Sequence, residues 1–234
     1  MRSPLKIHCL QHHQTESPAL IAEWANSQNF SLSVTKLHDG ASFPQPDDFD
    51  LLVVLGGQMG SYEASQYPWL KEEKHFLKQT ISLNKKVIGI GLGAQLIAEV
   101  LGGTVTRGPF WEVGWHEVEW TELAKEHPFF KGFPPRFRAF QWHHDTFTLP
   151  QGALQTATAT AYPTQGFLID NHIAGFQFHP EVTEELLLEW VGSHHCELPK
   201  ETFVQRIDEI LHQADRLDRA KSFLFTFLDR FTQA

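Results

Sequence analysis

Cysteine is scarce in this sequence, and long apolar runs are absent from it. The 234 residues include two cysteines, Cys9 and Cys196, which is typical of a reducing compartment and excludes a disulfide framework. Both thiols are expected to be buried and structural. No apolar stretch comes near the roughly 18 residues that a membrane helix needs, and the N-terminal residues lack the apolar core of a signal peptide. We therefore expect a cytoplasmic protein with no membrane partner.

Basic residues are also few. Lys and Arg number 19 against 28 Asp and Glu, which gives a formal charge of −9 and argues against a nucleic-acid partner. Histidine is abundant, with 14 residues, but its adjacent pairs would point to opposite faces of a strand, and no metal-ligand spacing occurs. These pairs are His12–His13, His143–His144 and His194–His195. We therefore expect neither a metal site nor a cofactor.

Segments with strand and helix patterns alternate through the first hundred residues. This order predicts an α/β fold with a doubly wound, mostly parallel sheet. In the first helix, Ser17 is expected to be the N-cap, with Pro18 at the first helical position. Ligands of such sheets bind beyond the carboxyl ends of the strands, where Gly56, Gly57 and Gly91 all lie. The predicted strands are Leu5–Leu10, Ser31–Leu37, Asp50–Leu55 and Lys86–Ile90, and the predicted helices run from Ser17 to Asn26, from Pro68 to Asn84 and from about Ala94.

From Thr104 onward the pattern changes to short strands and then to helices. The last helix carries a stripe of Phe223, Phe227 and Phe231, with Leu224 and Leu228 alongside, which is expected to be core packing or else a homodimer face. We expect one domain over residues 1–234, in which about 192–234 is a helical C-terminal extension. Antiparallel excursions from the sheet are predicted at Val113–Val118, Arg136–Phe140, Gln165–Ile169 and Ile173–Phe178. Helices are predicted at 183–191, 202–213 and 216–230, the second opened by a capping box of Thr202 and Gln205.

The segment Lys86–Leu101 predicts a strand, a sharp turn and a helix in immediate succession. Gly89, Gly91 and Gly93 alternate through the turn, and glycine tolerates the positive φ and the close backbone approach that such a turn requires. In enzymes, an elbow of this kind usually presents a nucleophile beside the N–H groups of a helix N-terminus. The residue at the apex is Gly91, which has no side chain that could attack a substrate.

A polar triplet lies at the end of the apolar segment Ile173–Phe178. Because side chains alternate along a strand, Gln177, His179 and Glu181 are expected to project to one face, and Pro180 marks the end of the strand. A histidine backed by a carboxylate is the arrangement that orients an imidazole as a general base. The triplet therefore predicts a proton-handling pair.

Five groups of residues, in this order, make the chain similar to a known family. From about Lys6 to the C-terminus it resembles the class I glutamine amidotransferases, in particular single-domain members similar to the glutaminase part of GMP synthase. The resemblance implies a flavodoxin-like α/β fold. The motifs are Gly56-Gly-Gln-Met-Gly-Ser-Tyr-Glu63 with Tyr67-Pro-Trp69, Gly89-Ile-Gly-Leu-Gly-Ala-Gln95, Glu112-Val-Gly-Trp115, Gln141-Trp-His-His-Asp145 with Leu149-Pro150, and Phe176-Gln-Phe-His-Pro-Glu-Val182.

The resemblance implies catalytic roles for particular positions. In the family a cysteine at the elbow attacks the amide of glutamine, forms a thioester and releases ammonia, and the matching position here is Gly91. The proton acceptor would be His179, and Glu181 would orient it. The backbone N–H groups of Gly57 and Leu92 would stabilise the oxyanion.

The resemblance also implies a glutamine-binding side of the site. Gln95 falls where the family contacts the substrate, and His143 and Asp145 belong to a segment near it. The sequence departs from the family at Gln58, where proline is common, and at His144, where a small residue is common.

The third departure is Gly91 itself, and it decides the expected chemistry. A thioester needs a sulfur atom, and losing a triad nucleophile typically costs about 10⁴–10⁶ in rate. Neither Cys9 in the first strand nor Cys196 before the last helices is expected to substitute for it.

Three functional hypotheses follow. The first is a non-catalytic module that binds glutamine or a γ-glutamyl compound, or serves as the partner of another protein. The second is an active amidotransferase or γ-glutamyl hydrolase, in which Gly91 is an introduced replacement for cysteine or a water activated by His179 replaces the thiol; a synthase that uses the ammonia would be a separate chain. The third treats Gly89-x-Gly91-x-x-Ala94 as a dinucleotide fingerprint, although no acidic residue ends a clear strand about twenty residues later.

Overall fold

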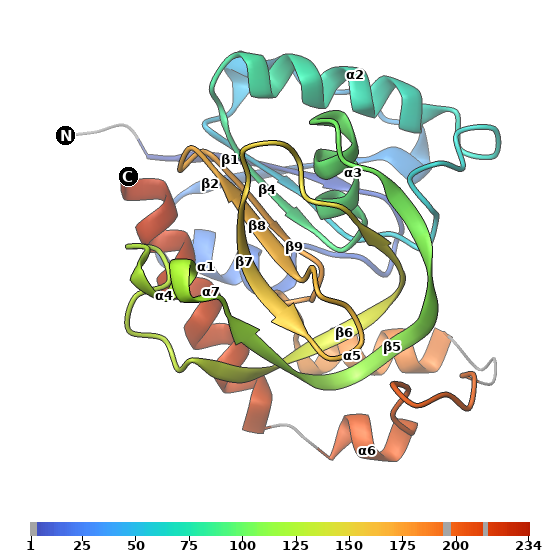
Figure 1. The fold of residues 1–234 in the computed structure, drawn as a ribbon. Coiled ribbons are helices and arrows are strands. Elements are labelled where there is room, and N and C mark those ends of the chain that lie inside the picture. The colour runs from blue at the N-terminus through green and yellow to red at the C-terminus, as the bar shows by residue number, and fades with distance from the viewer. Residues whose placement is uncertain (1–3, 194–197, 213–214) are drawn as a thin grey trace.

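A mixed sheet forms the centre of the molecule in the computed structural model, which describes residues 4–193, 198–212 and 215–234 (Figure 1). Within these residues the sheet has nine strands in the order β2-β1-β3-β4-β9-β8-β7-β5-β6. Neighbours from β2 to β9 are parallel, and neighbours from β9 to β6 are antiparallel. The predicted α/β class, with a parallel half and antiparallel excursions, is confirmed. The strands are β1 Lys6–Gln11, β2 Ser31–Lys36, β3 Leu51–Val54, β4 Lys86–Ile90, β5 Val105–Trp120, β6 Arg136–Phe147, β7 Leu154–Ala159, β8 Gly166–Ile169 and β9 Ile173–Phe176.

Helices cover both faces of the parallel half, as Figure 1 shows with α2 and α3 on one side and α1 and α7 on the other. The side chains of β3 alternate between these two layers. Leu51 and Val53 pack into the core under α1 and α7, whereas Leu52 and Val54 pack under α2 and α3. A strand that is apolar at every position is typical of a sheet covered on both faces. The helices are α1 Ala19–Ser27, α2 Trp69–Ser82, α3 Leu92–Val100, α4 Glu122–Glu126, α5 Glu184–Ser193, α6 Ile207–Leu211 and α7 Asp215–Gln233, with short 3-10 turns at Leu37–Asp39 and Pro46–Asp48.

The antiparallel half curls back toward the parallel half. Edge strand β6 reaches the segment that follows β9, where the N–H of His179 donates to the carbonyl oxygen of Phe140 at 2.8 Å. The antiparallel pair β5 and β6 is longer than predicted in both strands, and the pairing of β5 is irregular between Arg107 and Glu112. Strand β7 was not predicted at all, because Leu154–Ala159 has little apolar alternation. The curl matters because it brings β5 and β6 to the carboxyl ends of the parallel strands.

Two predicted helix starts are wrong. The N-cap of α1 is Pro18, which has no side-chain cap hydrogen bond, so Ser17 does not cap the helix. The second predicted tail helix begins at Ile207 instead of Thr202, and no capping box of Thr202 and Gln205 forms; residue 213 lies outside the described residues. The reason is tertiary, because residues 203–205 pair with β5 through Val113.

The phenylalanine stripe of α7 is core packing. Phe223, Phe227 and Phe231 are at most 8% exposed and pack against aromatic residues of the sheet, including Phe176. The alternative, that this stripe is a dimer face, is wrong because the stripe is already covered. No helix of the described residues is long and apolar enough to cross a membrane.

Candidate functional site

The elbow between β4 and α3 has the geometry that its glycines predict. Gly91 has φ +54° and ψ −115° and is the N-cap of α3, a conformation that L-residues rarely adopt. Its neighbour Gly93 lets the helix approach the sheet, because a Cβ there would lie 2.0 Å from the carbonyl oxygen of Val54. The helix begins at Leu92, two residues before the predicted start at Ala94. The strand, the sharp turn and the helix that the sequence predicts therefore follow one another directly, with Gly91 at the apex.

His179 faces the apex of this elbow. A Cβ placed on Gly91 would lie 3.0 Å from Cε1 and 3.2 Å from Nε2 of His179. On its other side the imidazole bonds through Nδ1 to Oε1 of Glu181 at 2.8 Å, and both residues are buried. Burial alone lowers the pKa of His179, but the charge and hydrogen bond of Glu181, with the charge of Glu16, raise that pKa above its ordinary value. An imidazole held in this way can accept a proton from a group at the apex.

A second carboxylate, which the sequence analysis missed, lies beside this pair. Glu16 and His179 both approach Gly56, where a Cβ would lie 2.8 Å from Oε2 of Glu16 and 2.9 Å from Cε1 of His179. Burial raises the pKa of Glu16 to about 7, with the charge of His179 opposing the rise and that of Glu181 adding to it. Glu16 lies in the loop after β1, and no pattern of neighbouring residues marks it as part of the site.

The Gly56–Gly57 turn is fixed from behind by a second histidine–carboxylate pair. His12 is fully buried, and its Nδ1 lies 2.8 Å from the carbonyl oxygen of Gly56 while its Nε2 lies 2.9 Å from Oε1 of Glu73. Burial alone lowers the pKa of His12, but the charge and hydrogen bond of Glu73 raise it overall. A protonated His12 would donate from both ring nitrogens, one to the turn and one to helix α2.

Among the described residues, the turn and the elbow each contribute one residue with a free backbone N–H to the lining of the same cavity. Gly57 and Leu92 both line it, and neither N–H has an acceptor within the described residues. Leu92 is the first residue of α3, where the helix dipole also favours a negative charge. Two donors at this position can stabilise an oxyanion.

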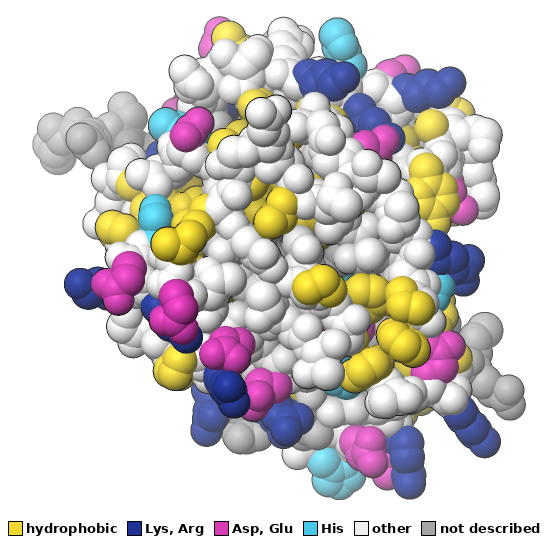
Figure 2. Space-filling view, in the orientation of Figure 1, with side chains coloured by type: hydrophobic (Ala, Val, Ile, Leu, Met, Phe, Trp, Pro, Cys, Tyr) yellow, Lys and Arg dark blue, Asp and Glu magenta, His cyan; other side chains and the backbone are white. Residues whose placement is uncertain are grey.

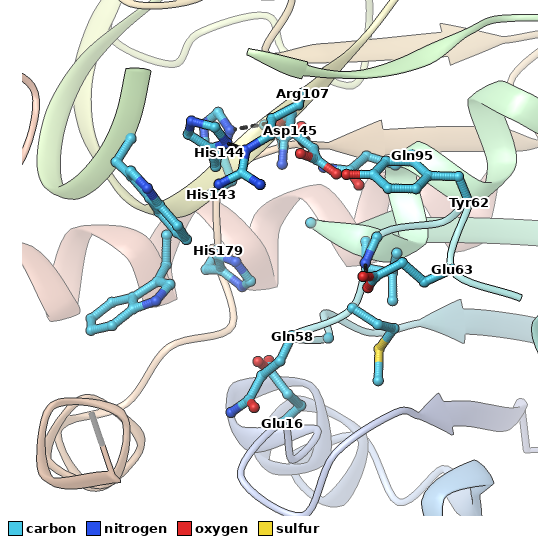
Figure 3. A pocket seen from close by; sticks show the side chains of 18 of the residues that line it. Glu16, Gln58, Tyr62, Glu63, Gln95, Arg107, His143, His144, Asp145 and His179 are labelled. Atoms are coloured by element: carbon cyan, nitrogen blue, oxygen red, sulfur yellow. Dashed lines mark hydrogen bonds between the residues drawn. The ribbon is translucent and has the colours of Figure 1, made fainter. Parts of the chain in front are cut away.

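Amide and carboxylate groups form the opposite wall. Gln95 Nε2 lies 3.2 Å from Oε1 of Gln177 and 3.4 Å from the carbonyl oxygen of Asp145. The Nε2 atom of Gln177 is buried and has no hydrogen-bond partner within the described residues. His143 is held from below, because its Nε2 lies 2.9 Å from Oε2 of Glu112 and its Nδ1 lies 2.9 Å from the carbonyl oxygen of Asp145. Figure 3 shows Gln95 and Asp145 converging at this end of the cavity, together with Tyr62.

The rim carries one cation. Arg107 donates from Nε to Nδ1 of His144 at 2.8 Å, and Figure 3 shows this hydrogen bond at the mouth. Burial and the Arg107 charge lower the pKa of His144, although Asp145 opposes them. Burial and the neighbouring Asp145 carboxylate raise the pKa of the Tyr62 phenol.

The cavity that these groups enclose measures about 230 Å³. All of the site residues that the sequence predicted contribute to its lining except Glu181, which lies behind His179. The prediction for the polar triplet is therefore only partly right. Strand β9 ends at Phe176, so Gln177, His179 and Glu181 follow the strand and do not alternate along it. The predicted site residues and members of the triplet that line the cavity are Gly57, Gly91, Leu92, Gln95, His143, Asp145, Gln177 and His179, and Gln58 and His144 line it as well.

The part of the chain that the structure describes holds neither a metal-ligand cluster nor an accessible thiol near the elbow. No group of three potential metal ligands occurs among these residues. Cys9 is buried in β1, and burial raises the pKa of its thiol to about 12. Cys196 and the pair His194–His195 lie outside the described residues.

The chain is similar to known proteins in both sequence and fold. The family model of "Glutamine amidotransferase class-I" matches residues 19–187. The glutamine amidotransferase-like protein YfeJ of Salmonella typhimurium is 30% identical over 98% of both chains. The glutamine-hydrolysing GMP synthase of Aeropyrum pernix is 32% identical over 60% of this chain and 27% of its own. The crystal structure of a glutamine amidotransferase from Thermotoga maritima has a TM-score of 0.91 at 32% identity, with both chains fully covered. The chain therefore belongs to the class I glutamine amidotransferase family.

Proposed function

We propose that this protein binds glutamine or a γ-glutamyl compound in the cavity and has little or no glutaminase activity. One observation carries the proposal: a side chain on residue 91 would begin 3.0 Å from Cε1 of His179, and Gly91 has no side chain there. Without a sulfur atom there, no thioester forms, and loss of a triad nucleophile costs about 10⁴–10⁶ in rate.

Ligand binding is supported by polar groups that have no partner within the described part of the protein. The cavity contains the N–H groups of Gly57 and Leu92 and the buried, unpartnered Nε2 of Gln177. A buried donor without an acceptor costs about 1–3 kcal/mol, so a ligand that supplies oxygen atoms is favoured. A carboxamide carbonyl near the two N–H groups and a carboxylate near Arg107 would satisfy donors at both ends.

A second candidate function is an active amidotransferase or γ-glutamyl hydrolase. It is favoured by the His179–Glu181 pair and by the N–H groups of Gly57 and Leu92, which line the cavity and are free among the described residues; binding alone does not need these groups. In this case a water activated by His179 would attack the amide, or Gly91 would be an introduced replacement for a catalytic cysteine. A synthase that uses the ammonia would be a separate chain in the cytoplasm.

Calorimetric titration with L-glutamine tests the proposal. We expect saturable binding by the native protein, and at least roughly tenfold weaker binding by Gln95→Leu, because an unpaired polar partner in the site costs more than about 1.4 kcal/mol. Gln79→Leu, an exposed glutamine on helix α2, is the matched control and should bind as the native protein does. Ammonia release by the native protein that disappears in His179→Ala would favour the second function instead. Failure of glutamine and γ-glutamyl dipeptides to bind would contradict the proposal.

A further inference from the structure

A second cavity, of about 380 Å³, lies between β6 and α7. Four arginines line it, and we call it the arginine cavity after them: Arg136, Arg138, Arg216 and Arg219. They are half of the eight arginines in a chain whose formal charge is −9. Figure 2 shows basic side chains gathered with acidic ones at the lower left of this face, where Figure 1 places the lower ends of β6 and α7. Such a concentration of guanidinium groups around a hollow favours an anionic ligand.

The arginines keep donors that the protein does not use. Arg219 has no hydrogen bond or ion pair within the described residues and is exposed. Arg138 donates only from Nη1 among these residues, to the carbonyl oxygen of Trp115 at 3.2 Å. Arg136 lies 3.2 Å from Glu119 and 3.9 Å from Glu117 in exposed pairs, and such pairs contribute little because water screens them. Each guanidinium carries five N–H donors in a planar fork, so these three side chains can still bind a phosphate or carboxylate bidentately.

Aromatic side chains form the inner wall of the same cavity. Phe133, Phe137 and Phe223 line it together with Trp120, and Trp120 stacks on Phe137 with ring centroids 4.6 Å apart. Trp120 is 1% exposed, and its indole N–H has no acceptor within the described residues. Buried indole N–H groups usually find a partner. The wall thus combines flat aromatic surface with one hydrogen-bond donor, the Trp120 N–H, that has no acceptor among the described residues.

We propose that the arginine cavity binds a small ligand in which a planar ring carries a phosphate or a carboxylate. The ring would lie against Phe137 and Phe223, and an acceptor atom of the ring would reach the Trp120 N–H. The anionic group would lie at the mouth, between Arg138 and Arg219. Aromatic stacking and charge-assisted hydrogen bonds are the two interactions that these residues offer, and the volume is within the range of small-molecule sites.

The arginine cavity is separate from the first cavity, although His179 lines both. Pro180 lines the arginine cavity. A ligand in the arginine cavity would therefore contact the segment that holds His179 on the side away from Gly91. The proposal does not depend on whether glutamine binds or is hydrolysed, because none of these four arginines lines the first cavity.

Calorimetric titration of the full chain at low salt, with four probes, tests the proposal. AMP carries a ring and a phosphate, and indole-3-acetate carries a ring and a carboxylate, so these two distinguish the two anions. Adenosine has the ring alone, and ribose 5-phosphate has the charge alone. We expect at least one ring-bearing anion to bind at least tenfold more tightly than both adenosine and ribose 5-phosphate.

Two variants locate the binding site. Arg219→Gln removes one donor set and should weaken binding of that anion at least fivefold. Ala220→Trp fills the space beside it on α7 and should abolish binding. Arg206→Gln, an exposed arginine that pairs with Asp208 away from the cavity, is the charge-matched control and should bind normally. An unchanged melting temperature shows that each variant folds.

Three results would overturn the proposal. The first is that neither ring-bearing anion binds, and the second is that ribose 5-phosphate binds as tightly as AMP, which would indicate a nonspecific basic surface. The third is equal binding by folded Arg219→Gln and by the native protein.

Discussion

The Nε2 atom of His179 lies 3.2 Å from the position that a Cβ on Gly91 would take. An imidazole at this distance is close enough to accept a proton from a thiol one bond further out. The backbone at residue 91 also keeps the positive φ of a nucleophile elbow. This geometry supports the proposal that residue 91 is a nucleophile position without its attacking atom. The proposal leads to tests of stability, protonation and chemistry.

Gly91→Ala should destabilise the fold. An alanine would be held at a φ that costs L-residues about 1–3 kcal/mol, and its methyl group would press on His179. In a protein of this length the melting temperature should fall by about 2–10 °C. Gly102→Ala is the control, because Gly102 also has positive φ but no atom within 4 Å of an added Cβ. If the His179 imidazole NMR signals shift in Gly91→Ala but not in Gly102→Ala, the shift reports the contact between the methyl group and His179 and not the backbone strain. A higher melting temperature of Gly91→Ala would contradict the expected destabilisation.

Glu16 should make stability depend on pH. Its folded pKa of about 7 lies above the ordinary value of 4.5, so between these pH values the folded state holds a proton that the unfolded chain has released. Stability should therefore fall as pH rises from about 4.5 to 7, by at most about 1.4 kcal/mol per pH unit. Glu16→Gln should flatten this slope in melting curves recorded across the window.

The raised pKa of His179 contributes a slope of the same sign, but only above its ordinary value of 6.5. The change that Glu16→Gln makes to the slope between about pH 4.5 and 6.5 therefore reports the carboxylate. Glu184→Gln, an exposed position on α5, is the control and should keep the native slope. Identical slopes in the native protein and in Glu16→Gln would show that Glu16 titrates normally.

Glu73→Ala should be strongly destabilising and should loosen the Gly56–Gly57 turn. Removing one partner of a buried charged pair costs about 3–5 kcal/mol, and His12 would lose the carboxylate that fixes its ring. Chemical denaturation measures the cost, and glutamine titration measures the effect on the turn. Glu72→Ala, one position earlier and exposed, should change neither. Equal stability of the two variants would mean that the His12–Glu73 pair does not hold the turn.

Phe227→Ala tests the proposal that the C-terminal helix belongs to the same domain as the sheet. Phe227 is fully buried against Phe130 and Phe176, and truncating a buried phenylalanine costs about 3–5 kcal/mol. We expect one cooperative transition, shifted to lower denaturant concentration with an unchanged slope. Phe225→Ala, at a partly buried position on the same helix, should cost less. A separate early transition for the tail would contradict a single domain.

The parallel half of the fold could be predicted because its signals are local. The run Leu51–Val54 is apolar at every position, and the glycines around Gly91 mark a strand–turn–helix junction. The antiparallel half could not be predicted as well. Residues 203–205 read as the start of a helix, but their pairing with Val113 overrides that propensity. Pairing between distant segments leaves no trace in a window of neighbouring residues.

The same distinction applies to the site. His179 and Glu181 are two positions apart and lie in a recognisable motif, so their hydrogen bond could be anticipated from the sequence. Glu16 meets His179 only because the chain folds, and the pairing of His12 with Glu73 spans 61 positions. Both contacts join loops or helices whose relative placement depends on the whole sheet.

The most direct test introduces the missing sulfur as Gly91→Cys. The variant, the native protein and the double variant Gly91→Cys/His179→Ala are treated with a glutamine analogue that carries an electrophile at the γ position. Intact mass and peptide mapping then locate any adduct. The buried Cys9 thiol, whose pKa is raised to about 12, should not react.

We predict one adduct on residue 91 in Gly91→Cys, together with ammonia release from glutamine at least about 10⁴-fold faster than in the native protein. The native protein should show neither, and the double variant should react far more slowly. Ammonia release by the native protein at the rate of the cysteine variant, or a folded Gly91→Cys that stays inert, would contradict the conclusion that the nucleophile is what this site lacks.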